Sequence, residues 1–118
     1  MITSAVATLF VADMDRAVRF YTESLGMALQ YRAGNEWAQI DAGGGFGIGL
    51  HPKEADKPAV PGSIQIGLNV DEPLEGVIAK LTSRGVVFAG PIKADGPIRL
   101  AFFKDPDGHV LYLCEYRG

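Results

Sequence analysis

Hydrophobic and polar residues alternate along several short stretches of this chain, while two longer stretches repeat their apolar residues every three or four positions. The first spacing is typical of strands and the second of helices. In the first half, a helix is expected over residues 14–25, with Asp13 as its N-cap and Gly26 just beyond its end. Strands are expected at residues 6–11, 29–32, 36–42 and 46–51.

The second half repeats this order. A strand over 63–70 precedes a helix that Asp71, Glu72 and Pro73 open with an acidic cap and a first-turn proline. The apolar stripe of that helix is Leu74, Val77, Ile78 and Leu81, and further strands are expected at 86–89, 98–104 and 109–116. The repeat predicts one α+β domain over 1–118. It comprises two βαβββ modules, about 1–51 and 63–118, joined by a linker at 52–62 that contains three prolines.

Strand parity separates two faces, because side chains two positions apart share a face. Every long strand has an aliphatic face, which we expect to meet a helix, and a mixed face of aromatic, amide and glycine residues. Pairing Lys104 with His109 puts Leu100 and Phe102 on the aliphatic side. The predicted mixed faces carry Val6, Thr8, Phe10, Trp37, Gln39, Asp41, Gly47, Gly49, His51, Gln65, Gly67, Asn69, Arg99, Ala101, Phe103, Val110, Tyr112 and Cys114.

Two sheets curled around their mixed faces predict a cupped, barrel-like mixed sheet with helices on its outer face. The cavity of such a cup is where small molecules usually bind. On this prediction Gly47, Gly49 and Gly67 leave volume for a guest, whereas Gly43, Gly44 and Gly45 form a hairpin turn.

Composition narrows the possible partners. The chain has 14 acidic and 11 basic side chains, for a net charge of −3, and its basic residues are scattered, which argues against nucleic acid. No run of 18 apolar residues and no secretory leader pattern occurs, so a membrane partner is not expected. The single Cys114 excludes an intramolecular disulfide and suits the cytoplasm. The remaining candidate partners are a small molecule and a second copy of the chain.

Two segments resemble one family. They are residues 11–21 (VADMDRAVRFY), followed by Leu25-Gly26-Met27, and residues 103–109 (FKDPDGH). Both are similar to the vicinal oxygen chelate superfamily, which includes glyoxalase I, extradiol dioxygenases and bleomycin-resistance proteins. The resemblance covers nearly the whole chain and implies two βαβββ modules around a ligand cavity, usually completed by homodimerisation.

The resemblance also implies where a metal would be held. Metal-dependent members place ligands at four positions that correspond here to Val6, Gly49, Gln65 and Tyr112. Divalent metals in such sites prefer imidazole and carboxylate ligands, so this donor set predicts no metal and no cofactor. The leading hypothesis is therefore a metal-free binding protein that sequesters a planar or amphipathic compound, similar to the antibiotic-resistance members.

Two alternatives stay open: a lyase, isomerase or transferase that works without the usual metal, and an interaction partner with an empty cup. Arg99 is a candidate anchor for a ligand carboxylate or phosphate. Asp41, His51 and Tyr112 are the candidate catalytic residues, whereas Cys114 and His109 are interpreted as an inert thiol and a turn residue. The candidate ligand-binding residues are Thr8, Phe10, Trp37, Gln39, Gly49, Gln65, Asn69, Arg99, Phe103 and Tyr112.

Overall fold

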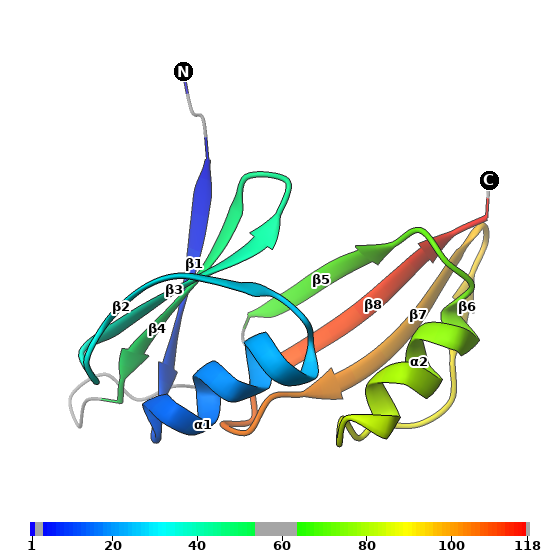
Figure 1. The fold of residues 1–118 in the computed structure, drawn as a ribbon. Helices are drawn as coiled ribbons and strands as arrows, with labels where there is room; N and C mark the ends of the chain where they lie inside the picture. Colours follow the sequence, from blue (N-terminus) through cyan, green and yellow to red (C-terminus); the bar gives the residue numbers. More distant parts are fainter. Residues whose placement is uncertain (2–3, 54–63, 118) are drawn as a thin grey trace. The chain divides into compact units, whose positions relative to one another are not determined.

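The computed structural model describes residues 1, 4–53 and 64–117, so the expected linker lies outside the described residues apart from Pro52 and Lys53. The chain divides into two compact units, Met1–Val60 and Pro61–Gly118. The elements of the first unit are β1 (Ala5–Val11), α1 (Met14–Arg19), η1 (Phe20–Ser24), β2 (Ala28–Ala33), β3 (Trp37–Gly43) and β4 (Phe46–Pro52) (Figure 1). Those of the second are β5 (Gln65–Val70), α2 (Leu74–Ser83), β6 (Lys93–Asp95), β7 (Ile98–Lys104) and β8 (Val110–Tyr116).

Each unit contains a four-stranded mixed sheet, and the two sheets have the same topology. The strand orders are β1-β4-β3-β2 and β5-β8-β7-β6. In both, the first and last strands of the unit pair in parallel and the remaining pairs are antiparallel. The predicted α+β fold of two βαβββ modules is therefore confirmed. The described strands form two separate sheets and do not close into a barrel.

The first helix begins and ends where the sequence predicts. The Asp13 carboxylate accepts a hydrogen bond from the Arg16 backbone N–H at 3.1 Å, which caps the first turn. Beyond Arg19 the helix widens into the π-helical turn η1, and Gly26 follows with a φ of 76°. Ala17 and Tyr21 are fully buried.

The start of α2 differs from its prediction. Pro73 is the N-cap residue and makes no side-chain capping bond, so the expected acidic cap from the preceding residues is wrong. The backbone N–H of Leu74 donates instead to the Glu115 carboxylate at 3.1 Å, across 41 positions of sequence. A helix N-terminus needs an acceptor for its first N–H groups, and here β8 supplies one.

The expected strand at 86–89 is also wrong. Val86 is buried, but Phe88 makes only an isolated bridge with Phe103, and the second strand of this unit in chain order is β6. The Ala89 N–H reaches the Phe102 carbonyl at 2.8 Å, after which Gly90 takes a φ of 76° and Pro91 follows. A left-handed residue and a proline without an N–H end the pairing there.

Strand parity in the first unit is confirmed. Ile40 pairs with Ile48, and both are fully buried, whereas Val6 on the other face of its strand is 48% exposed. β5 follows the same rule, with Ile66 buried and Gln65 exposed. The pattern of polar and apolar residues thus fixes which side of each of these strands remains open.

The register of β7 against β8 is one residue away from the expected pairing. Lys104 pairs with Val110, not with His109, and this places Phe103 opposite Leu111 in the core. The loop is longer because Asp105 organises it: its carboxylate accepts the N–H groups of Asp107 and His109 at 2.9 and 2.8 Å. A one-residue shift moves every side chain of a strand to its other face.

Candidate functional site

The open face of the first sheet carries the predicted mixed set of residues. Gln39 pairs with Gly49 and Asp41 with Gly47, while Thr8 of β1 lies beside Gly49 on its other flank. The side chains of β3 on this face are therefore Trp37, Gln39 and Asp41. The structure brings these candidates together, and their role in ligand binding stays a prediction.

An aromatic cluster lies at one end of this face. The His51 ring meets Phe10 edge-on with centroids 5.5 Å apart and Trp37 at 6.3 Å. His51 Nδ1 lies 2.8 Å from the Pro52 carbonyl. A carbonyl oxygen only accepts, so Nδ1 is the donor in this contact. The cluster offers flat apolar walls with one fixed imidazole among them.

Three glycines on the open faces lie under side chains of the chain itself, although the sequence predicted that they leave room for a ligand. A Cβ built on Gly49 would collide with the Trp37 indole, one on Gly67 would lie 2.5 Å from Tyr112 Cζ, and one on Gly47 would lie 2.5 Å from Gln39 Nε2. The chain's own side chains thus lie directly over these glycines. The space that the sequence indicated for a guest is occupied, and the glycines instead let Trp37 and Tyr112 lie flat against the sheet.

This packing predicts the effect of Gly49→Ala. The new methyl group forces the Trp37 indole off the sheet, so we expect the unfolding free energy to fall by about 1–3 kcal/mol and the tryptophan emission to shift. Trp37 is the single tryptophan of the chain, so fluorescence reports on it alone. Gly76→Ala is the matched control, because a Cβ at Gly76 in α2 meets nothing within 4 Å. It should leave the emission unchanged; an unchanged emission in Gly49→Ala as well would contradict the packing.

A hollow of about 280 Å³ lies at the other end of the same face. It is lined by the β3–β4 turn, the start of β1 and side chains of β2 and β3: Ser4, Ala5, Val6, Gln30, Gln39, Asp41, Gly44, Gly45, Phe46 and Gly47. Asp41 and Gln39 thus connect the hollow with the aromatic cluster along one strand.

The open face of the second sheet has its own aromatic pair. Phe102 and Tyr112 pair across β7 and β8 with ring centroids 5.3 Å apart, and Lys93 Nζ lies 5.2 Å from the centre of the Phe102 ring. Tyr112 extends over Gly67, and Asn69 pairs with Cys114. This face therefore combines two aromatic rings with amides and one lysine.

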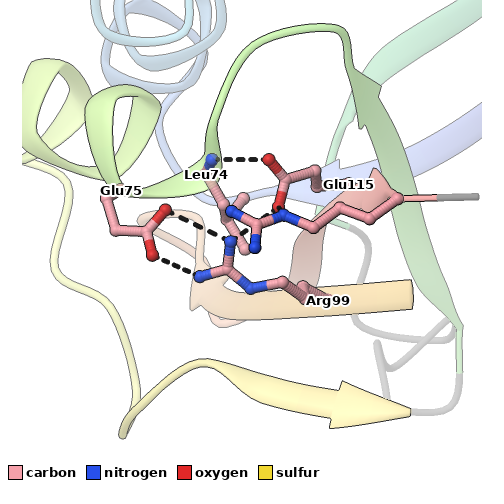
Figure 2. A network of polar contacts seen from close by, with 5 residues as sticks. Leu74, Glu75, Arg99 and Glu115 are labelled. Carbon is pink, nitrogen blue, oxygen red and sulfur yellow. Dashed lines mark hydrogen bonds and ion pairs between the residues drawn. The ribbon is translucent and has the colours of Figure 1, made fainter. Parts of the chain in front are cut away.

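The structure corrects the predicted placement of Arg99 and Phe103. Phe103 is fully buried, and Arg99 lies on the helix side of the sheet, where its guanidinium pairs with Glu75 of α2 and, at 2.7 Å, with Glu115 (Figure 2). The hydrogen bond from Arg99 lowers the pKa of Glu75, and the same contact raises the pKa of Arg99. Two carboxylates of the chain already hold the guanidinium, so it does not serve as the expected ligand anchor on the open face.

Sequence reasoning missed Phe102 and Lys93 as open-face residues. The signal for Phe102 is Asp105 at the start of the turn, since an aspartate there can accept backbone N–H groups further along the loop. Lys93 lies on β6, a strand that the sequence did not predict. Counting a five-residue loop at 105–109 gives the observed register.

The described residues do not fit the family's metal. Val6 and Gly49 offer no side-chain donor, and the Tyr112 hydroxyl lies over Gly67. Within the described ranges, no three His, Cys, Asp or Glu side chains gather in a group that could hold a metal ion. The donor chemistry at the four implied positions is too poor for a divalent cation.

Two further candidates lie outside the aromatic clusters. His109 belongs to the loop that Asp105 organises, and Cys114 is a half-buried free thiol on the open face of β8.

No helix in the described part of the chain is long and apolar enough to span a membrane.

The two repeated βαβββ modules are features by which the chain can be compared with known protein families. The model of the Glyoxalase/Bleomycin resistance protein/Dioxygenase superfamily matches residues 3–113, and the chain belongs to this superfamily.

Individual relatives of the chain differ in what they are named for. TnmS3, an antibiotic binding protein from Streptomyces sp. CB03234, is 30% identical with a TM-score of 0.80, over 98% of this chain and 97% of that one. A probable lactoylglutathione lyase of Vibrio parahaemolyticus is 32% identical over 91% of this chain and 86% of its own length. Virulence protein STM3117 of Salmonella typhimurium is 30% identical over 92% and 80%.

Proposed function

We propose that this chain is a metal-free, cytoplasmic binding protein that sequesters a planar or amphipathic small molecule on the open faces of its sheets. The observation that carries the proposal is the composition of those faces: aromatic rings lie flat over Gly49 and Gly67, and Gly49 is one of the four positions where the family resemblance implies a metal ligand. Flat rings with neighbouring amides suit stacking on a planar ligand. The similarity to an antibiotic binding protein supports the same interpretation.

Titration with bleomycin, followed through the Trp37 emission, tests the first face. We expect a saturable change that persists in a chelator, and protein purified without added ions should carry less than stoichiometric metal. Phe102→Leu tests the second face without touching the fluorophore, and should weaken binding measured by calorimetry if that face takes part. Stoichiometric bound metal, or binding that a chelator abolishes, would contradict the metal-free proposal.

A second candidate function is a glyoxalase-like lyase or isomerase that acts without the usual metal. It is favoured by Asp41 and His51, which share one face with Trp37, and by relatives named lactoylglutathione lyase. Turnover of the hemithioacetal of methylglyoxal and glutathione in chelator, lost in Asp41→Asn, His51→Gln or Tyr112→Phe, would support this candidate over sequestration. No turnover together with saturable binding supports sequestration.

The proposal includes a homodimer, as the family resemblance implies. Light scattering behind size exclusion should give twice the chain mass across the working concentration range. A monomer mass at every concentration would contradict this part and leave the binding proposal to be judged by the titration.

A further inference from the structure

The described lining of the hollow at the end of the first sheet contains one charged side chain. That residue is Asp41, whose carboxylate accepts the Gly43 N–H at 2.7 Å. This bond holds one carboxylate oxygen in the turn and fixes the direction of the side chain. Gly43, Gly44 and Gly45 all have positive φ values, so the wall of the hollow is a turn without side chains that brings backbone close to the carboxylate.

The other polar groups of the hollow are neutral. Gln30 and Gln39 contribute side-chain amides, and Ser4 contributes a hydroxyl, while among the described residues no lysine, arginine or histidine belongs to the lining. The carboxylate of Asp41 is therefore the source of charge in the described lining of the hollow. A guest with a positive group gains a charge-assisted hydrogen bond there, whereas a carboxylate or phosphate meets a like charge.

The hollow and the aromatic cluster lie along one strand. Trp37, Gln39 and Asp41 alternate on the open face of β3, and the residues opposite them on β4 include two glycines. At about 3.3 Å per residue, the Cα atoms of Trp37 and Asp41 are roughly 13 Å apart. This order suits a ligand with a planar ring system, which would stack on the aromatic cluster, and an amine on a short arm, which would reach the Asp41 carboxylate.

We infer that the hollow binds a protonated amine, with Asp41 as its counter-charge, and that the preferred ligands are amphipathic aromatic cations. The inference rests on the proposed binding function and narrows its ligand class. The net charge of −3 acts in the same direction, because an acidic protein attracts cations over distance.

A matched series of ligands tests the inference. Naphthylethylamine, naphthylethanol and naphthylacetate share one ring system and carry a positive, a neutral and a negative group at neutral pH. We expect calorimetry to give the tightest binding for the amine, by about tenfold over the alcohol, with the acetate weakest. Asp41→Asn should remove the preference for the amine over the alcohol.

Asparagine is the informative replacement because its side-chain oxygen still accepts the Gly43 N–H, so the turn is kept while the charge is removed. Asp71→Asn at an exposed position makes the same change in net charge and should keep the preference. Equal binding of all three ligands, or a preference for the amine that survives in Asp41→Asn, overturns the inference and leaves the binding function standing. If none of the three ligands binds, this inference is overturned. If the bleomycin titration also shows no binding, the proposed function is overturned as well.

Discussion

Phe103→Ala is expected to lower the free energy of unfolding by about 3–5 kcal/mol, whereas Phe102→Ala should lower it by less than half as much. The two residues are neighbours of identical chemistry, but Phe103 is fully buried opposite Leu111 and Phe102 is half-buried on the open face. Truncating a fully buried ring removes its transfer free energy and leaves a cavity. Urea unfolding followed by circular dichroism measures both variants.

The comparison tests the register of β7 because the pairing expected from sequence predicts the opposite order. In that pairing Phe102 lies in the core and Phe103 on the open face. A larger loss for Phe102→Ala, or equal losses, would contradict the register of the structure. Ligand titration adds a second readout, since Phe102→Ala changes the open face and Phe103→Ala does not.

Glu115→Ala is the second substitution with a large expected effect. The Glu115 side chain is 10% exposed and accepts hydrogen bonds from Leu74 N–H at 3.1 Å, Arg99 at 2.7 Å and Arg117 at 3.1 Å. Its removal leaves the first N–H of α2 without its acceptor and deprives Arg99 of a partner. We expect a loss of about 2–3 kcal/mol, measured by urea unfolding.

A control separates this role from a simple loss of charge. Glu72→Ala removes an exposed carboxylate that lies two residues before α2, on the segment where the sequence predicted the cap. It should change stability by less than about 0.5 kcal/mol. If Glu72→Ala costs as much as Glu115→Ala, the helix takes its cap locally and the long-range contact is not what stabilises it.

The pH dependence of the Glu75 contact follows from the direction of its pKa. The hydrogen bond from Arg99 lowers the pKa of Glu75 in the folded chain. The contact therefore contributes its full stability above the ordinary glutamate pKa, and loses it as the pH falls through the lowered folded value. The stability difference between the natural chain and Glu75→Gln should be present at neutral pH and disappear in acid. A difference independent of pH would contradict this account.

Local patterns of sequence determined most of the first unit. The alternation in β1 and the pairing of Ile40 with Ile48 followed from side-chain parity and a glycine turn, both of which depend on near neighbours. The Asp13 cap and the Gly26 end of the first helix are equally local. The order of elements in both units was readable for the same reason, whereas the superfamily resemblance came from the motifs at residues 11–21 and 103–109.

Only the tertiary structure decided three features. The Asp105 loop set the register of β7, since a single residue in a turn reverses which face of a strand is open. Glu115 capped a helix 41 positions away, a contact that no local pattern encodes. Trp37 and Tyr112 took the space over Gly49 and Gly67, because the missing Cβ atoms let a ring from a neighbouring strand lie flat on the sheet. Local spacing therefore fixed the elements and most of their faces, whereas contacts between residues distant in sequence decided which side chains the open faces present.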